Sequence, residues 1–157
     1  MSRQINDAGL QLIKSFEGFK PDVYVDIAGH YTIGYGTCFY ADGTPVNKGD
    51  PSIDEPTAAQ LLQSKLNSEF CPGVEKLITV NINDNQFAAL VALAYNIGLG
   101  NFQQSTVLRC TNMKNWDDAA RAFLLWDKGT VNGERVVVPG LLRRRQAESE
   151  LFLGNVS

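Results

Sequence analysis

The segment 16–37, which reads FEGFKPDVYVDIAGHYTIGYGT, constrains the fold of this chain more than any other. Residues 23–25 and 31–35 are rich in β-branched and aromatic side chains, as is typical of short strands. Between them, residues 27–29 (Ile-Ala-Gly) fit a three-residue hairpin loop whose glycine adopts the left-handed conformation. The segment therefore predicts a small β-hairpin.

The length of this loop decides which side chains share a face of the hairpin. With three loop residues, Asp26 lies opposite His30. Tyr24 then lies opposite Thr32, and Asp26 and Thr32 become diagonal neighbours about 7 to 8 Å apart. In that register the carboxylate and the hydroxyl can hold one water between them. A two-residue loop would instead send the two side chains to opposite faces.

A further acid, Glu17, precedes the hairpin at the predicted end of a helix. Asn6 or Asp7 can cap the start of that helix, and Gly18 is suited to ending it. Glu17 would then lie near the negative end of the helix dipole, where its charged form is disfavoured. Glycoside hydrolysis uses two such acids: one protonates the departing oxygen, and a carboxylate on the other side assists water or attacks the sugar. Spacing alone still favours two solvated surface acids, because Asp and Glu are mostly exposed.

The complete motif is more specific than the spacing of the two acids. Glu17, then Asp26 nine positions on, then Thr32 six positions later, followed by IGYG, resembles the catalytic motif of the phage-type lysozymes of glycoside hydrolase family 24. The order of Trp, Gly-rich loop, Pro-Gly-Leu, paired Arg and Glu over residues 126–148 resembles the C-terminal segment of lambdoid-type members. The resemblance implies that Glu17 is the general acid, and that Asp26 and Thr32 position the attacking water.

This resemblance implies an α+β, lysozyme-like fold. A small N-terminal β-hairpin lobe would be joined by a long helix to a larger α-helical lobe, with a cleft between them. A chain of 157 residues with 44% hydrophobic content fits one globular domain, or two small lobes that share a core. We expect a single catalytic domain over residues 1–157. Its N-terminal helix and β lobe would cover about 1–53, the linking helix about 54–70 and the helical lobe about 71–157.

Local signals place the remaining elements. Asp54 can cap the linking helix, which we expect to break at residues 71–73 (Cys-Pro-Gly). Asn83 and Gln86 have the spacing of a capping box, and they open a helix that is apolar around most of its circumference, as in a central buried helix. The other predicted elements are a strand between about 39 and 46, a short helix over 74–78, helices after Ser105 and Asn115, a hairpin around Asn132-Gly133 and a last helix after Pro139-Gly140.

Four residues are candidates for binding the saccharide. The resemblance places Tyr95, Asn96 and Ser105 where family members line the cleft. We add His30, which faces Asp26 across the predicted hairpin. Tyr95 also fits core packing, and Ser105 also fits a helix N-cap.

Glycines and tryptophans near these candidates have two interpretations each. Gly34 and Gly36 share the predicted face of Thr32 and either admit a sugar ring or mark a bulge. Trp116 and Trp126 invite a sugar-stacking interpretation, but both fit a periodic apolar stripe, so we expect them in the core.

The run Arg143-Arg144-Arg145 has three interpretations: a solvated helix face, a structural ion pair inside the helical lobe, or support of the catalytic acid. In the family, an Arg from this lobe pairs with the catalytic Glu. This implies Arg144 as the partner of Glu17. Such a pair would stabilise the charged form of Glu17 and oppose the effect of the helix end.

Cysteine and histidine usage argues against a metal centre. Cys38, Cys71 and Cys110 are widely spaced and form no CxxC pair, which suits free thiols in a reducing compartment. One bridge, Cys38–Cys71 or Cys71–Cys110, is the alternative. A single His and scattered Cys leave no zinc cluster, so we expect neither a metal nor a cofactor.

Charge and hydropathy limit the partners. The net charge is −3, and the excess of basic residues after position 108 is too small to argue for nucleic-acid binding. The N-terminal region lacks the apolar core of a signal peptide, and no run approaches the roughly 20 apolar residues that span a bilayer. We therefore expect a protein of the host cytoplasm without stable membrane insertion. By the resemblance, a separate holin-like protein would permeabilise the membrane and admit it to the cell wall.

Together with these observations, the resemblance implies a phage endolysin, acting as a monomer, that cleaves the β-1,4 bond between N-acetylmuramic acid and N-acetylglucosamine in bacterial peptidoglycan. A Thr-assisted water needs the carboxylate separation of inverting enzymes, about 6.5 to 9.5 Å, rather than the about 5 to 5.5 Å of a covalent mechanism. The alternatives are a lytic transglycosylase and a peptidoglycan-binding module without catalysis. The intact set of two acids and a hydroxyl favours an enzyme, because a pure binder needs no proton donor beside a water site.

Overall fold

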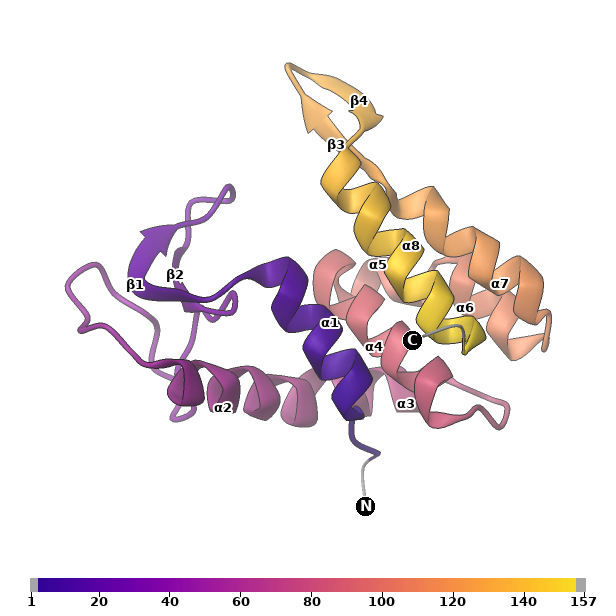
Figure 1. Cartoon of the computed structure of the whole chain (residues 1–157), viewed down its shortest axis with the longest axis horizontal. Coiled ribbons are helices and arrows are strands. Elements are labelled where there is room, and N and C mark those ends of the chain that lie inside the picture. Colours follow the sequence, from indigo (N-terminus) through magenta and orange to yellow (C-terminus); the bar gives the residue numbers. More distant parts are fainter. Residues whose placement is uncertain (1–2, 155–157) are drawn as a thin grey trace.

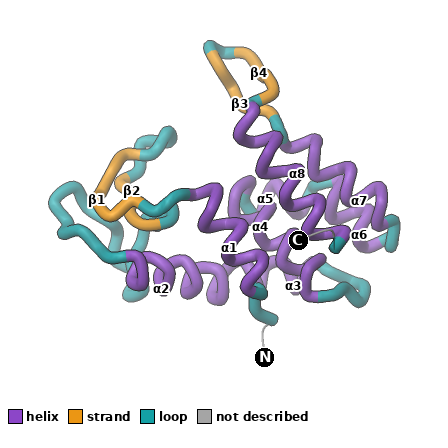
Figure 2. Tube along the Cα trace, in the orientation of Figure 1, coloured by secondary structure: helices purple, strands orange, loops and turns teal. Residues whose placement is uncertain are grey.

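The computed structural model describes residues 3–154 and has the lysozyme-like α+β architecture that the sequence predicted (Figure 1). A small lobe contains the hairpin of β1 (Lys20–Val25) and β2 (Tyr31–Gly34), and α2 (Glu55–Lys65) runs from this lobe toward a larger group of helices. Strands occur in two separate hairpins at the edges of the molecule (Figure 2). The elements are α1 (Asp7–Glu17), β1 (Lys20–Val25), β2 (Tyr31–Gly34), α2 (Glu55–Lys65), η1 (Leu66–Phe70), α3 (Cys71–Leu77), α4 (Asp84–Ile97), α5 (Leu99–Gln103), α6 (Thr106–Asn112), α7 (Trp116–Phe123), η2 (Leu124–Trp126), β3 (Lys128–Val131), β4 (Glu134–Val137) and α8 (Pro139–Leu153).

Helix α1 ends where its sequence predicted. The side chain of Asn6 accepts a hydrogen bond from the backbone N–H of Gly9, which caps the first turn. Gly18 has φ of 74°, a conformation that L side chains rarely adopt, and its N–H donates to the carbonyl of Lys14. Glu17 is therefore the last residue of the helix.

The β1–β2 hairpin has the predicted register. Tyr24 pairs with Thr32, and the backbone N–H of Asp26 donates to the carbonyl of His30 over 2.9 Å. Gly29 has φ of 87°, so the three-residue loop closes as expected. The register confirms that Asp26 and Thr32 lie on one face.

The chain after β2 differs from the prediction. The second strand ends at Gly34, and the chain reverses through Gly36, so that Ile33 and Thr37 form an isolated bridge. The strand expected between about 39 and 46 is reduced to a single bridge of Phe39 with Pro45. The ladder does not extend because the carbonyl of Tyr40 accepts from the N–H of Gly43, and the N–H of Thr44 donates to the side chain of Asp42.

The linking helix begins at the predicted cap, but the predicted break after it is wrong. Asp54 accepts a hydrogen bond from the N–H of Thr57, which starts α2. The chain then continues through the π-helical turn η1 directly into α3. Pro72 lies in the first turn of α3, where the missing N–H breaks no helical hydrogen bond, and the wider turn before it keeps the chain helical.

Helix α4 lies in the centre of the helical lobe. The predicted capping box is present: Asn83 accepts from the N–H of Gln86, and the side chain of Gln86 accepts from the N–H of Asn83. Every residue from 87 to 94 is buried. A methyl group on Gly9 of α1 would come within 2.6 Å of the Cβ of Ala88, so α1 packs against α4 at backbone distance.

One cluster of buried apolar side chains extends through both lobes. It includes Tyr35 from the small lobe, Leu62 from α2 and Phe152 from α8. Trp116 packs against Phe152 with ring centroids 6.3 Å apart, and Trp126 also packs against this cluster, as the apolar stripe predicted. The packing of α1 and η1 against α4, and of α2 against β2, therefore fixes the two lobes relative to each other.

Three further features complete the fold. Helix α5, a single turn after Gly98, was not predicted, because a five-residue helix carries too short a pattern to recognise. The β3–β4 hairpin turns at Asn132 and Gly133, both with positive φ, as the Asn-Gly pair predicted. Within residues 3–154, no helix has the length and apolar character needed to cross a membrane.

Candidate active site

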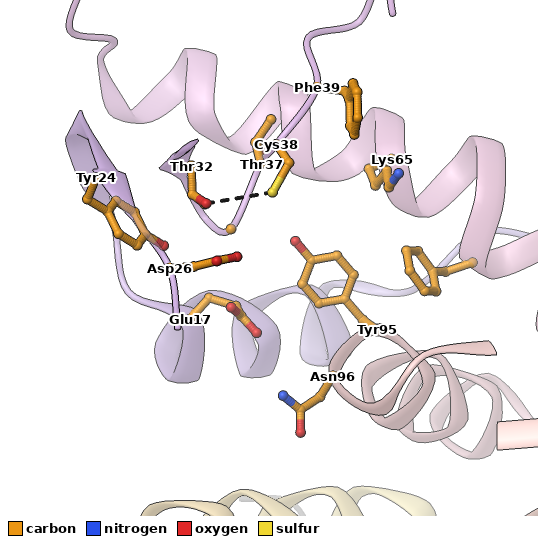
Figure 3. Close-up of a pocket in the computed structure, with 12 residues that line it drawn as sticks. Glu17, Tyr24, Asp26, Thr32, Thr37, Cys38, Phe39, Lys65, Tyr95 and Asn96 are labelled. Atoms are coloured by element: carbon orange, nitrogen blue, oxygen red, sulfur yellow. Dashed lines mark hydrogen bonds between the residues drawn. The ribbon is translucent and has the colours of Figure 1, made fainter. Parts of the chain in front are cut away.

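A cavity of about 340 Å³ lies between the two lobes, and it contains the three residues of the predicted catalytic motif (Figure 3). Glu17 comes from the end of α1, Asp26 from the turn after β1 and Thr32 from β2. The cap at Gly18 and the hairpin register place these three side chains around one space, although they come from separate elements.

Glu17 is held by an ion pair with the helical lobe. Nη1 of Arg144 donates to Oε2 of Glu17 over 2.8 Å, and the side chain of Glu17 is 21% exposed. Oε1 lies on the other side, close to Gly36, where an added Cβ would be only 3.1 Å away. One oxygen of the acid is thus fixed by a cation, and the other faces the cavity wall.

Asp26 is arranged to stay ionised. Its Oδ1 accepts hydrogen bonds from the N–H of His30 over 2.8 Å and from the N–H of Ala28 over 2.9 Å. The backbone hydrogen bond from His30 is the main cause of a lowered pKa for Asp26, so the carboxylate is charged at neutral pH. Both amides bind Oδ1, whereas Oδ2 lies 3.6 Å from Nδ1 of His30.

Thr32 is 2% exposed, and its hydroxyl has a fixed orientation. It donates to the carbonyl of His30 over 2.9 Å and lies 3.6 Å from Sγ of Cys38. The main chain of His30 therefore holds both Asp26 and Thr32. The His30 side chain is exposed and does not line the cavity.

The other predicted saccharide-binding residues take different positions. Tyr95 and Asn96 line the cavity (Figure 3). The hydroxyl of Tyr95 donates to the carbonyl of Tyr35 over 2.8 Å, which links α4 to the small lobe, and burial raises the pKa of Tyr95. Ser105 lies outside the cavity lining. It is buried and caps α6 by accepting from the N–H of Leu108.

Sequence analysis missed some of the residues that line the cavity and misplaced one other. Gly36 lines the cavity, whereas Gly34 packs against Ala58 of α2, so the expectation that both glycines share one face is wrong. The reversal after Gly34 is the reason. Tyr24 could have been found by strand alternation, because it shares the face of Asp26. The other lining residues that were not predicted come from loops and helices, where no such alternation exists: Thr37, Cys38, Phe39, Lys65 and Phe70.

Each arginine of the run 143–145 corresponds to a different interpretation. Arg143 is exposed, Arg144 reaches Glu17, and Arg145 is fully buried beside Glu148. Nε of Arg145 lies 2.8 Å from Oε1 of Glu148, and Nε of Arg144 lies 3.4 Å from Oε2. The helical lobe thus contains a buried ionic network that ends at the candidate acid. Cys38, Cys71 and Cys110 are free thiols.

The fold and the paired acids together define a lysozyme-like architecture. A glutamate at a helix end, an aspartate held ionised by backbone N–H groups and a buried threonine hydroxyl line one cavity between two lobes. The model of the phage lysozyme family matches residues 14–148. The chain therefore belongs to the phage lysozyme family.

Two relatives that are similar in sequence are phage endolysins. The chain is 42% identical over 151 residues to the endolysin of Bacillus phage B103, covering 95% of this chain but 54% of that protein. It is 38% identical over 150 residues to the endolysin of Salmonella phage P22, covering 96% and 98% of the two chains. The chain thus spans about half the length of the first relative and nearly the whole length of the second.

Solved structures show the same architecture. The endolysin from Escherichia coli O157:H7 phage FAHEc1 superposes with a TM-score of 0.90 at 40% identity, covering 98% of this chain and 96% of that one. The muramidase domain of SpmX from Asticaccaulis excentricus superposes with a TM-score of 0.86 at 35% identity, covering 96% and 99%.

Proposed function

We propose that this protein is an endolysin that hydrolyses the β-1,4 bond between N-acetylmuramic acid and N-acetylglucosamine in bacterial peptidoglycan. Membership of the phage lysozyme family supports a peptidoglycan hydrolase with a role in phage lysis. The similarity to a structure named as a muramidase domain supports the choice of bond. The observation that carries the proposal is the convergence of Glu17, Asp26 and Thr32 on one cavity.

In the proposed reaction, Glu17 is the general acid and donates its proton to the departing glycosidic oxygen. Asp26 is the base. Because its Oδ1 is occupied by two backbone N–H groups, Oδ2 is the atom that accepts a proton from water.

Thr32 completes the water site. Its hydroxyl hydrogen is used by the carbonyl of His30, so its oxygen can only accept from a water molecule. A water that donates one hydrogen to Asp26 and the other to Thr32 presents a lone pair to the sugar. This arrangement supports direct attack by water with inversion, rather than a covalent intermediate on Asp26.

The remaining parts of the proposal concern binding and release. Tyr95 and Asn96 would contact the saccharide from the helical side of the cavity, and we include neither Ser105 nor the side chain of His30 in the binding surface. The catalytic unit would be one domain that acts as a monomer on the cell wall. It would be made in the host cytoplasm and would depend on a separate holin-like protein for release.

Hydrolysis of purified peptidoglycan by the wild type and by Glu17→Gln tests the proposal. The wild type should lower the turbidity of cell walls and release muropeptides with reducing N-acetylmuramic acid ends. Glu17→Gln keeps the shape of the side chain but has no proton to donate, so turnover should fall at least about a thousandfold. Glu134→Gln, an identical change on the exposed strand β4, should leave the rate unchanged.

The products and the variants separate the alternatives. Anhydro-muramic products identify a lytic transglycosylase, and binding without turnover identifies a non-catalytic module. Substantial activity in Glu17→Gln shows that the acid is assigned to the wrong residue.

A further inference from the structure

The carboxylate of Glu148 lies next to the candidate active site, but the proposed reaction does not use it. The side chains of Glu148 and Arg145 are both 0% exposed, and Arg144 is 6% exposed. Arg144 binds Glu17 through Nη1 over 2.8 Å and approaches Glu148 through Nε over 3.4 Å. The guanidinium of Arg144 is therefore shared between the acid at the cavity and a carboxylate inside the lobe.

Charge balance in this network depends on the state of Glu17. Two guanidiniums face two carboxylates when Glu17 and Glu148 are both ionised. Burial raises the pKa of Glu148 to about 7, and the attraction of Arg145 and Arg144 opposes this rise. When Glu17 carries the proton that the reaction needs, Glu148 alone faces both cations. Glu148 contacts Arg145 through both of its oxygens, with Nε–Oε1 2.8 Å and Nη2–Oε2 3.1 Å. Buried charges interact strongly because little water screens them. Loss of the Glu148 carboxylate would therefore leave both cations to stabilise the charged form of Glu17.

We propose that Glu148 is a positioning residue for the reaction. Its carboxylate shares the guanidinium of Arg144 with Glu17. Arg144 therefore orients Glu17 but stabilises its charged form less than an arginine with no second partner would. The proposal rests on the proposed function, since it assumes that Glu17 is the proton donor.

Other charged and titratable groups also face Glu17. Asp26 and Tyr24 approach from β1 and its turn, and Tyr95 approaches from α4. The negative charge of Asp26 acts in the same direction as that of Glu148, because both oppose a second negative charge at Glu17. Among the described residues, none of these three groups has a hydrogen bond or ion pair with Glu148 or Arg145, so variants at those two positions act on the cavity through Arg144.

The pH dependence of the turnover rate tests the proposal. Glu148→Gln keeps the shape of the side chain and leaves two cations without an internal counter-charge. The alkaline limb of the pH–rate profile, which reports the proton donor, should move to lower pH, and the rate above neutral pH should fall about tenfold. Glu150→Gln, the same change at an exposed position of α8, should keep the wild-type profile.

Variants at Arg145 should shift the pH–rate profile in the opposite direction and should rescue the Glu148 variant. Arg145→Gln removes a cation and leaves Glu148 to Arg144, so the alkaline limb should move to higher pH. In the double variant Arg145→Gln/Glu148→Gln one charge of each sign is lost, and the limb should return toward the wild-type position. If Glu148→Gln does not fold, the direction of the shift in Arg145→Gln decides the question.

A purely structural role gives a different result. It predicts that Glu148→Gln lowers the rate equally at all pH values, and that the double variant is no better than the single one. Either result overturns the proposal, as does an Arg145→Gln profile that is unshifted or shifted to lower pH. An inactive wild type would instead refute the proposed function. An active wild type together with an unshifted Glu148→Gln profile would refute only this inference.

Discussion

Tyr24 has a free hydroxyl within the cavity. No hydrogen bond from this hydroxyl is present among residues 3–154, and the ring directs it toward Asp26 and Glu17 (Figure 3). Burial, followed by the negative charges of Glu17 and Asp26, raises the pKa of Tyr24. The phenol is therefore a neutral donor that lines the cavity beside the two acids.

Removal of this donor should slow the reaction without affecting the fold. We expect Tyr24→Phe to lower the turnover rate about tenfold, the effect of one lost hydrogen bond in the transition state. The measurement is the rate of muropeptide release, with the unfolding midpoint as a check on stability. Tyr31→Phe is the matched control, because Tyr31 lies on the opposite face of the same hairpin and outside the cavity lining. Equal rates in the two variants would mean that the Tyr24 hydroxyl does not contact the substrate.

At the scale of the element, the reversal after β2 shapes one wall of the cavity. Gly36 has φ of 87°, and an added Cβ would lie 3.1 Å from Oε1 of Glu17 and 3.2 Å from the hydroxyl of Tyr95. Gly43, in the next turn, has φ of 88° and no atom within 4 Å of an added Cβ. The two glycines therefore have the same backbone requirement but different surroundings.

These two positions allow backbone strain to be separated from crowding of the site. Gly36→Ala and Gly43→Ala should each cost about 1 to 2 kcal/mol of unfolding free energy, because both residues are left-handed. Only Gly36→Ala should also lose activity, by about tenfold or more, since its methyl group displaces Glu17 or Tyr95. Thermal unfolding and cell-wall lysis measure the two effects. If both variants lose activity in proportion to stability, the close approach at Gly36 has no functional role.

Local signals predicted those elements whose boundaries depend on a few neighbouring residues. The Asn83 capping box and the loop closed by Gly29 both lie where the sequence placed them, because each depends only on short-range backbone geometry. The break expected at 71–73 did not occur, since a π-helical turn absorbed Pro72 within a continuous helix. A turn of this kind is stabilised by tertiary packing and leaves no periodic signal.

The same distinction applies to the candidate site. Glu17, Asp26 and Thr32 come from one short segment and were found from its spacing. Lys65 and Phe70 reach the cavity from α2 and η1, and nothing in their local sequence indicates this. The roles of the three arginines could likewise be assigned only from the structure. Adjacent helical residues point in different directions, and the packing of α8 decides which arginine contacts Glu17.

At the scale of the whole molecule, the two lobes are connected through α2. Leu62 is 0% exposed and belongs to the same buried cluster as Tyr35 of the small lobe and Phe152 of the helical lobe. Both tryptophans of the chain, Trp116 and Trp126, lie in the helical lobe, so their fluorescence reports the unfolding of that lobe alone. Because the core is shared, a destabilising substitution at Leu62 should also lower the unfolding midpoint that the two tryptophans report.

Leu62→Ala therefore tests whether the chain is one cooperative unit. The lost side chain should cost about 2 to 5 kcal/mol of unfolding free energy. In a two-state transition, tryptophan fluorescence and far-ultraviolet circular dichroism should shift to the same lower denaturant midpoint. Leu125→Ala, at a position that is 61% exposed, should change the midpoint little. If the lobes unfold separately, the fluorescence midpoint of Leu62→Ala will stay at the wild-type value while circular dichroism shows an earlier transition. In that case the cavity between the lobes would open without unfolding of the helical lobe, and the distance from Glu17 to Asp26 would not be fixed by the core.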